Sequence, residues 1–203
     1  MSALKRLRPQ PDDRFTFFQG FLKRPREVGS IIPSSRFLER RVTRAAQLER
    51  ADLAIELGPG TGGTTRSFLR AMKPDAKLLA IEINPRFVAS LRRMDDPRLI
   101  VHLGSATELR EALDHYGLPA PNAILSGIPF STMARPLGHA ILRSVYDVLE
   151  PGGLFVAYQV RDRVEMLGRE VFGDARVQRE LLNVPPMRVY RWVKQAGEAE
   201  RGR

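Results

Sequence analysis

The sequence of 203 residues predicts an α/β fold built on a parallel sheet with helices on both faces. From residue 52 onward, short apolar segments alternate with helix-like segments, and strands that are apolar throughout are typical of a sheet buried on both sides. A glycine-rich turn, Gly58 to Gly62, joins the first strand to the first helix, and an acid, Glu82, ends the second strand. Glycines at such a turn let a ligand approach the backbone closely, so these features together predict a ligand-binding sheet edge.

Most of the positive charge lies at the front of the chain. The formal net charge is +10, and residues 1–50 hold 12 Lys and Arg against five Asp and Glu. Such a field attracts polyanions, meaning nucleic acid or an anionic membrane surface. A role in solubility alone is the third possibility, and charge by itself does not choose among the three.

A short amphipathic helix is predicted over residues 14–24, just before Pro25. Four of the ten phenylalanines lie within seven residues, and helical spacing places them with Leu22 on one broad apolar surface flanked by basic residues. Such a helix is suited to lie in a lipid headgroup layer. Packing on its own domain is the alternative, and both hold if the helix docks in one state and inserts in another. The residues assigned to membrane contact are Arg14, Phe15, Phe17, Phe18, Phe21, Leu22, Lys23 and Arg24.

The remaining elements follow in order. A linker over residues 28–35 leads to a helix over about residues 36–48, which Ser34 or Ser35 can cap. Its inward residues are expected to be Phe37, Leu38, Val42, Ala45 and Ala46. Strands are predicted at 52–55, 78–84, 97–103, 122–125 and 154–160, with helices at 64–72, 85–92, 107–116 and 134–149. Two last strands, 177–182 and 188–193, are expected to form a hairpin that closes the sheet, before a loose tail.

Composition limits the classes of function. The chain has no cysteine, which excludes a disulfide framework and a thiolate nucleophile or metal ligand. Its three histidines, His102, His115 and His139, share no helical spacing, so no metal site is expected. No apolar run of about 18 residues and no apolar signal core occur, so we expect neither a membrane-spanning helix nor export, and we expect a cytoplasmic protein.

The glycine turn indicates a particular cofactor. Its form, E-x-G-x-G-x-G from Glu56 to Gly62 with an acid after the next strand, resembles class I S-adenosylmethionine-dependent methyltransferases rather than NAD enzymes. An ordinary strand–helix turn is the alternative. Glu82 is placed to hold the two hydroxyls of a ribose. The resemblance assigns the methionine part to Glu56, Gly58, Pro59, Gly60, Thr61 and Gly62, the adenine ring to Ile83, and the adenine edge to Ser105 and Ala106. Related enzymes usually carry an Asp at the place of Ser105.

The fourth strand ends in Ser126-Gly127-Ile128-Pro129-Phe130, which is expected beside the reactive methyl group, and Ser126 and Gly127 are assigned to the cofactor. Methyltransferases that act on the exocyclic amines of bases carry Asn- or Asp-Pro-Pro-Tyr, or Asn-Leu-Pro-Tyr, at this place. Their amide or carboxylate accepts a hydrogen bond from the target amine, and Ser126 is a poor substitute for it. The segment therefore argues against base methylation. A proline turn with a core phenylalanine is the simpler interpretation of Pro129 and Phe130.

Three segments together resemble the soluble bacterial phospholipid N-methyltransferases, which are themselves similar to rRNA adenine dimethylases. They are residues 25–35 (P-R-E-V-G-S-I-I-P-S-S), residues 56–62 and residues 126–130, and the resemblance extends over about residues 15–194. It implies a seven-stranded Rossmann-like sheet and stepwise methylation of phosphatidylethanolamine to phosphatidylcholine, with S-adenosyl-L-homocysteine as the second product. It also implies that the N-terminal helix binds anionic membranes and that the segment with Pro33 and Ser34 folds over the cofactor.

Two aromatic residues are candidates for catalysis. Tyr158 and Phe130 follow or end strands near the expected site, and aromatic faces stabilise an alkylated ammonium. The Tyr158 hydroxyl is also able to accept or relay the proton that the amine loses, and a purely structural hydrogen bond is the alternative. A general base elsewhere, or a chain of water, is not identified by the sequence.

The predicted organisation is a membrane-binding segment (1–35), a methyltransferase domain (36–194) and a tail (195–203). We expect a phospholipid substrate, an anionic membrane surface as partner, a peripheral position on the inner face of the cytoplasmic membrane, and no nucleic acid. The sequence leaves the oligomeric state open and favours a monomer. An RNA adenine N6-methyltransferase is the first alternative, favoured by the high isoelectric point and weakened by Ser126 and by the lack of an RNA-binding domain after residue 194. A membrane protein that has kept the fold without activity is the second.

Overall fold

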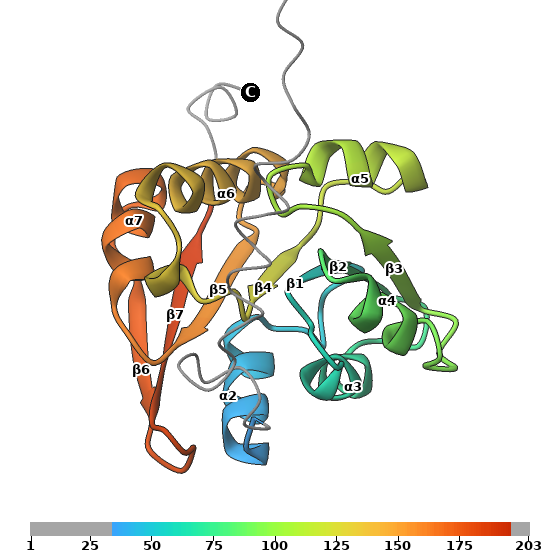
Figure 1. Ribbon diagram of the computed structural model, residues 1–203, viewed down its shortest axis with the longest axis horizontal. Coiled ribbons are helices and arrows are strands. Elements are labelled where there is room, and N and C mark those ends of the chain that lie inside the picture. The colour runs from blue at the N-terminus through green and yellow to red at the C-terminus, as the bar shows by residue number, and fades with distance from the viewer. Residues whose placement is uncertain (1–33, 196–203) are drawn as a thin grey trace, which may run out of the picture. The chain divides into compact units, whose positions relative to one another are not determined.

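The computed structural model describes residues 34–195, which form a seven-stranded sheet with helices on both faces (Figure 1). The strand order is β3-β2-β1-β4-β5-β7-β6. The strands are β1 (Leu53–Leu57), β2 (Lys77–Glu82), β3 (Leu99–Leu103), β4 (Ala123–Ser126), β5 (Leu154–Gln159), β6 (Arg176–Glu180) and β7 (Met187–Val193). The helices are α2 (Arg36–Ala45), α3 (Gly63–Ala71), α4 (Pro85–Leu91), α5 (Leu109–Tyr116), α6 (Arg135–Val148) and α7 (Arg163–Phe172), with a 3-10 turn η1 (Phe130–Thr132).

The predicted fold class is confirmed. Strands β1 to β5 pair in parallel, and β7 runs antiparallel between β5 and β6, as the predicted closing hairpin requires. The chain order reverses at β1, which lies between β2 and β4: Leu57 pairs with Ile81 on one side and with Ser126 on the other. This register brings the ends of β1, β2 and β4 together at one edge, where ligands bind in sheets of this kind.

Two hydrophobic layers hold the helices to the sheet. One face of the sheet packs on α5, α6 and α7, and the other packs on α2 and α3. The central strand β1 is buried along its whole length, as its apolar sequence predicts. Helix α7 has no counterpart among the predicted elements. Its Gly168 lies against Trp192 of β7, where an added Cβ would stand 2.4 Å from Trp192 Cζ2, so only glycine allows this helix to pack so closely.

Helix α2 begins where it is predicted but ends at Ala45, three residues before its predicted end. Ser35 caps it, because the Ser35 hydroxyl accepts a hydrogen bond from Leu38 N at 3.2 Å. Leu38 and Val42 are buried as expected, whereas Phe37 is 38% exposed, so the prediction that Phe37 points inward is wrong. The buried stripe of the helix continues through Ala46, and Phe37 lies one residue, about 100°, away from it.

Within residues 34–195, no helix is long and apolar enough to cross a membrane. The predicted amphipathic helix over residues 14–24 lies outside the described residues, as does Pro33. The assignments of those residues to membrane contact and to the cofactor therefore stay predictions.

Candidate functional site

The glycine turn between β1 and α3 has the backbone that its sequence predicts. Gly58, Gly60 and Gly62 adopt φ angles of +70°, +58° and +84°, a region that other residues rarely enter. A Cβ added to Gly58 would stand 3.0 Å from Ile128 Cγ1, so the turn packs directly on the loop after β4. A Cβ added to Gly60 would meet no atom within 4 Å, so open space lies above the middle of the turn. A ligand can therefore approach the backbone at Gly60.

The Glu82 carboxylate is fixed beside this open space. Gly60 N donates a hydrogen bond to Glu82 Oε2 at 3.0 Å, and Asn84 N donates to Glu82 Oε1 at 2.9 Å. The residue is buried, and this burial raises the pKa of its carboxyl, against the opposing effect of the backbone donors. Each carboxylate oxygen can accept a further hydrogen bond, so both remain able to bind the two hydroxyls of a ribose.

The Glu56 carboxylate forms hydrogen bonds within the protein, and its assignment to the cofactor stays a prediction. It has no exposed surface, and the hydroxyls of Thr64 and Thr65 in the first turn of α3 donate hydrogen bonds to its two oxygens, each at 2.6 Å. Burial raises the pKa of Glu56 to about 7, the two hydroxyls oppose this rise, and the nearby Glu82 charge adds to it. Glu56 therefore binds the start of α3 to the end of β1 and is able to exchange a proton near neutral pH.

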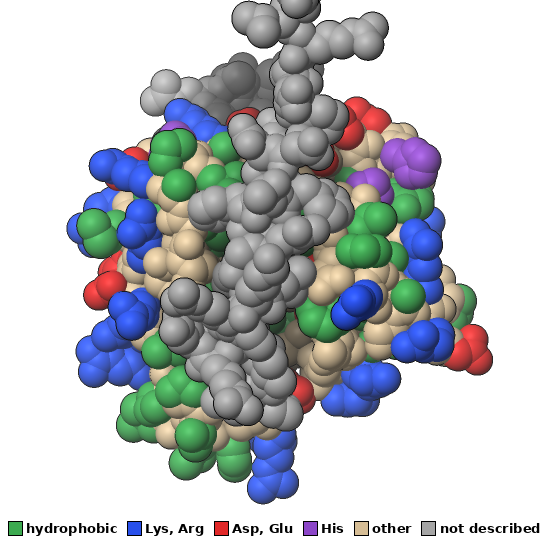
Figure 2. Space-filling view, viewed as in Figure 1, with side chains coloured by type: hydrophobic (Ala, Val, Ile, Leu, Met, Phe, Trp, Pro, Cys, Tyr) green, Lys and Arg blue, Asp and Glu red, His purple; other side chains and the backbone are tan. Residues whose placement is uncertain are grey.

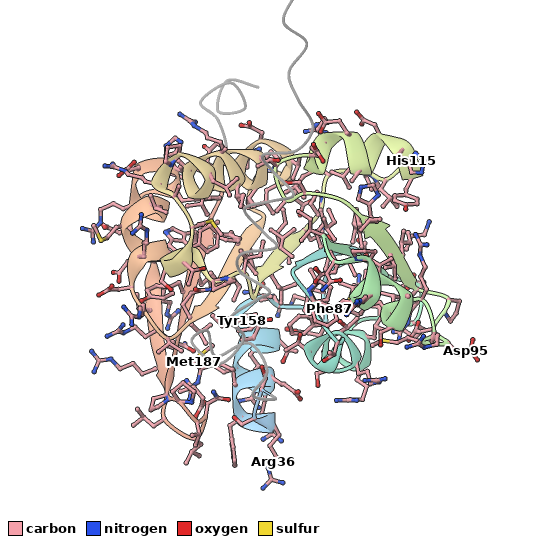
Figure 3. The ribbon with its side chains drawn as sticks, in the orientation of Figure 1. Arg36, Phe87, Asp95, His115, Tyr158 and Met187 are labelled. Atoms are coloured by element: carbon pink, nitrogen blue, oxygen red, sulfur yellow. The ribbon has the colours of Figure 1, made fainter. Side chains whose placement is uncertain are left out.

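Tyr158, which is predicted to be catalytic, lies in β5 on the same side of the sheet as α3, and Figure 3 shows it in that view between Phe87 of α4 and Met187 of β7. A Cβ added to Gly127 would stand 2.7 Å from the Tyr158 hydroxyl, so this hydroxyl lies against the loop after β4. Tyr158 also lies near the Thr64 hydroxyl, which opposes the rise in the pKa of Tyr158, and Thr64 itself donates to Glu56. Burial, together with the Glu56 charge, raises the pKa of Tyr158, so its hydroxyl stays neutral at physiological pH.

The loop after β4 is held by hydrogen bonds to both backbone groups of Ile128. The buried Ser126 hydroxyl accepts from Ile128 N at 3.3 Å, and Gln159 Nε2 donates to Ile128 O at 2.7 Å. Ser126 is thus occupied within its own turn. Phe130 has no exposed surface and packs in the core near Gly138, 3.5 Å from the position of a Cβ there. These surroundings are those of a core phenylalanine, and a contact of Phe130 with the substrate stays a prediction.

The residues assigned to adenine lie at the ends of the next two strands. Ile83 is half-buried directly after Glu82, and Ala106 is buried. Ser105 Oγ and Thr107 Oγ1 are 2.8 Å apart, and Thr107 N donates to Ser105 Oγ at 3.2 Å, so the Ser105 hydroxyl stabilises its own turn. Of the other assigned positions, Pro59 is buried, Thr61 is exposed and Ser34 is half-buried before α2.

The structure adds four polar residues that the sequence reasoning did not assign to the site. Thr64 and Thr65 bind Glu56, Asn84 offers its N–H to Glu82, and Gln159 holds the loop after β4. A signal existed for the two threonines, since they are hydroxyl residues in the first turn of a helix that begins directly after the glycines. Gln159 carries no such signal, because its partner is 31 residues away.

Comparisons with known proteins agree with this geometry. Residues 54–153 match the family model described as "Methyltransferase domain". The chain is 29% identical to an ornithine lipid N-methyltransferase of Singulisphaera acidiphila, over 91% of this chain and 98% of that protein. It is 30% identical to a ribosomal RNA small subunit methyltransferase A of Phenylobacterium zucineum over 67% of this chain, but it spans only 46% of that protein's length.

Solved structures share the fold. A 1,6-didemethyltoxoflavin-N1-methyltransferase of Burkholderia thailandensis superimposes with a TM-score of 0.67 at 15% identity, over 95% of this chain and 94% of that one. A putative O-methyltransferase of Klebsiella pneumoniae gives a TM-score of 0.61 at 18% identity, over 94% of this chain and 93% of that one. The first of these was solved with S-adenosylhomocysteine bound.

Proposed function

We propose that this protein, an S-adenosylmethionine-dependent methyltransferase, methylates the amine nitrogen of a membrane lipid. The observation that carries the proposal is the length of the match to the lipid N-methyltransferase, which covers 91% of this chain and 98% of that relative. The ribosomal RNA relative is matched over less than half of its own length. A likeness that extends over nearly the whole of both chains supports a shared class of substrate better than one confined to a common catalytic domain.

The residues at the sheet edge fit the cofactor. The space above Gly60 admits a ligand to the backbone, and Glu82 presents acceptors for ribose hydroxyls beside it. The first turn of α3 offers backbone N–H groups that have no acceptor within the helix. When bound, S-adenosylmethionine supplies an electrophilic methyl group on a sulfonium. The chain itself then has to hold the lipid amine in line with that group, which is a large part of the rate enhancement in reactions of this kind.

The amine must lose a proton before its lone pair can form the new N–C bond. We propose that the hydroxyls of Tyr158 and Thr64 carry this proton to Glu56, whose Oε1 accepts from Thr64 Oγ1 at 2.6 Å. In this scheme the Tyr158 oxygen accepts the proton from the amine as Tyr158 passes its own to Thr64, and Thr64 passes its own to Glu56. Tyr158 is thus a relay with a neutral hydroxyl, and Glu56, with a pKa of about 7, is the final acceptor.

Phosphatidylethanolamine, converted stepwise to phosphatidylcholine at the membrane surface, is the substrate that we propose first. The reason is the resemblance of residues 25–35, 56–62 and 126–130 to phospholipid N-methyltransferases. Ornithine lipid is the second candidate, favoured by the named activity of the relative. Both lipids present a primary amine at the membrane surface, so one site can serve either.

An RNA adenine N6-methyltransferase is the alternative from another class. The similarity to ribosomal RNA methyltransferases and the net charge of +10 favour it. The loop after β4 weakens it, because Ser126 stands where an amide or carboxylate would accept from the base, and its hydroxyl already accepts from Ile128 N. An aromatic amine would find no such side-chain acceptor at that position.

The test is a transfer assay with the full chain and radiolabelled S-adenosylmethionine. Vesicles of phosphatidylethanolamine with anionic lipid, vesicles of ornithine lipid with anionic lipid, and total RNA are offered in parallel. Glu82→Ala, which is expected to bind the cofactor weakly, is the control with reduced transfer. We expect label in a lipid fraction, and chromatography of mono-, di- and trimethylated products gives the number of steps. Label in RNA alone would overturn the proposal.

A further inference from the structure

The turn between β6 and β7, residues 181–186, exposes a cluster of large apolar side chains. Leu181 is 71% exposed, Leu182 is 62% exposed and Val184 is 78% exposed. Figure 2 shows hydrophobic side chains gathered at the lower end of the molecule, where Figure 1 places this turn below β6 and beside α2. A concentration of apolar side chains at one projecting turn is typical of a surface that contacts a partner or a membrane.

This turn, which we call the apolar tip, is held in place by its own polar residues. Asn183 Oδ1 accepts from Ser35 N at 2.9 Å, and Asn183 Nδ2 donates to Pro185 O at 2.8 Å. Glu180 accepts from Leu182 N at 2.9 Å with one oxygen and from Arg41 Nε at 2.8 Å with the other. The polar groups are therefore satisfied on the protein side, and the apolar side chains remain on the outside.

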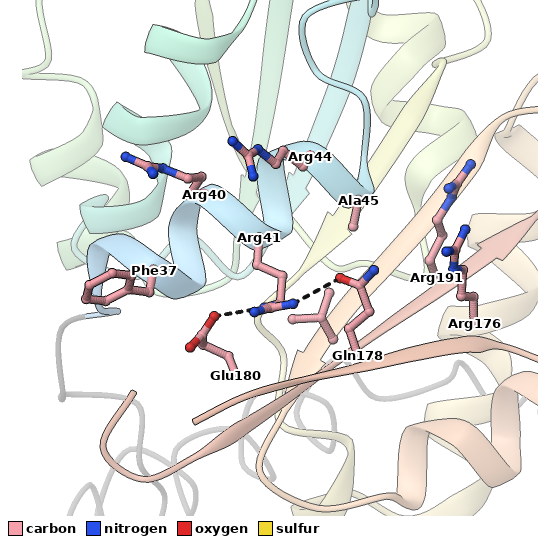
Figure 4. Close-up of a pocket in the computed structure, with 10 residues that line it drawn as sticks. Phe37, Arg40, Arg41, Arg44, Ala45, Arg176, Gln178, Glu180 and Arg191 are labelled. Atoms are coloured by element: carbon pink, nitrogen blue, oxygen red, sulfur yellow. Dashed lines mark hydrogen bonds and ion pairs between the residues drawn. The ribbon is translucent and has the colours of Figure 1, made fainter. Parts of the chain in front are cut away.

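A groove rich in arginine lies next to the apolar tip, between α2, β6 and β7 (Figure 4). Its volume is about 470 Å³, and its charged lining residues are Arg40, Arg41, Arg44, Arg176, Arg191 and Glu180. Figure 4 shows Arg41 reaching Glu180 and Gln178, with Arg176 beside Arg191. The other four arginines form no ion pair with any carboxylate in residues 34–195, and Arg191 Nε is buried without a hydrogen-bond partner there. We call this the arginine groove.

The apolar tip lies at the edge of the sheet that holds the cofactor site. Strand β6 is antiparallel to β7, and β7 is antiparallel to β5, so β6 runs in the same direction as β1, β4 and β5. The end of β6 at Glu180 therefore lies at the same edge as Glu82, Ser126 and Tyr158. A flat surface that met the apolar tip would thus also face the edge at which the methyl group is transferred.

We propose that the apolar tip and the arginine groove together form a membrane-contact surface for an anionic bilayer, separate from the predicted N-terminal helix. This inference rests on the lipid substrate proposed above. The leucines and the valine of the tip enter the boundary between headgroups and acyl chains, as exposed apolar side chains do at such interfaces. The arginines bind lipid phosphates, because cations next to an inserted segment are attracted to an anionic leaflet. The contact holds the cofactor edge against the headgroups, so the lipid need not leave the bilayer.

Insertion can be measured at one residue, because the chain has no cysteine of its own. Leu182→Cys is labelled with an environment-sensitive fluorophore, and Met166→Cys, at a 69% exposed residue of α7 on the opposite face of the sheet, is the matched control. Vesicles of phosphatidylglycerol and phosphatidylethanolamine are added to the full-length protein. We expect a blue shift and quenching by a shallow lipid-bound quencher at residue 182 and neither at residue 166. An equal response at the two residues, or a response at residue 182 to RNA but not to vesicles, would overturn the inference.

Affinity provides a second measurement. We expect the Leu181→Asp, Leu182→Asp variant to bind the vesicles at least about tenfold more weakly than Met166→Asp. The control for the double variant Arg40→Gln, Arg44→Gln is Arg93→Gln, Arg143→Gln, which changes two exposed arginines outside the groove. At low salt we expect the groove variant to bind the vesicles about tenfold or more weakly than this control. Equal binding of each variant and its control would contradict the surface proposed here.

The two proposals fail in different ways. If the wild-type protein methylates lipid dispersed in detergent while the label at residue 182 stays in water on vesicles, the membrane-contact surface is wrong and the lipid function stands. If the label enters the bilayer but no lipid is methylated, the substrate is wrong. The apolar tip variant is expected to keep its methyl transfer to lipid in detergent, because its cofactor edge is unchanged. On vesicles it is expected to lose most of its methyl transfer, because the membrane contact is lost.

Discussion

The stability of the protein should fall as pH rises through the range in which Glu56 titrates. In the unfolded chain its carboxyl has the ordinary pKa of 4.5, and burial raises this pKa to about 7 in the folded protein. Between these values the folded state binds more protons than the unfolded state, so the free energy of unfolding decreases with rising pH. The loss is complete above pH 7, where both states are ionised, and absent below pH 4.5.

The size of this effect follows from the two pKa values. One pKa unit corresponds to about 1.4 kcal/mol, so Glu56 lowers the free energy of unfolding by about 2.5 kcal/mol between pH 5 and pH 8. For a domain of this size, that corresponds to about 5–10 °C in the midpoint of thermal unfolding. The Glu56→Gln variant has no such titration, and its amide can still accept from one threonine hydroxyl and donate to the other.

The assay is thermal unfolding of wild-type protein and Glu56→Gln at pH 5 and pH 8, without cofactor. From pH 5 to pH 8, we expect the midpoint of thermal unfolding of the wild type to fall by about 5–10 °C more than that of the variant. Titrating groups that do not interact with Glu56 cancel, because they are present in both proteins, and Glu82 is the carboxyl coupled to Glu56. Glu111→Gln, at an exposed position of α5, is the control and should follow the wild type. Equal pH dependence in wild type and Glu56→Gln would refute the assignment of a raised pKa to Glu56.

Three further outcomes are expected. Tyr158→Phe should lower kcat by about 100-fold and leave the Kd for S-adenosylmethionine unchanged by calorimetry, since it removes the proton relay and no cofactor contact. Glu82→Ala should weaken cofactor binding by about tenfold or more in the same titration, because Gly60 N and the ribose hydroxyls lose their acceptor. An unchanged Kd would exclude the predicted ribose contact of Glu82. Phe15→Asp with Phe18→Asp should weaken binding to anionic vesicles without changing the Kd for the cofactor, and equal vesicle binding would remove the predicted role of the N-terminal helix.

Some features of the fold could be predicted because their signals are local. The apolar strands, the helices between them and the glycine turn are encoded within a few residues each, and positive φ at Gly58, Gly60 and Gly62 follows from the residue type. The position of Glu82 could also be predicted, since the end of a neighbouring parallel strand lies beside the turn that follows the first strand, and its ribose contact stays a prediction. Helix α7 was missed because Gly168 interrupts its pattern, and the reason for that glycine is Trp192, a residue of another strand.

The sequence by itself therefore determined the α/β class, the order of the strands and helices between residues 36 and 193 apart from α7, and the cofactor edge. Only the tertiary structure decided what surrounds each polar residue. The pKa of Glu56 lies near neutral pH because the sheet buries its carboxyl completely, and the two hydroxyls of α3 only partly oppose this rise. The arginine groove is a single basic surface because α2 packs across β6 and β7, more than 130 residues later in the chain, as the bond from Arg41 to Gln178 shows. Burial and charge density depend on which segments pack together, and no local pattern encodes that.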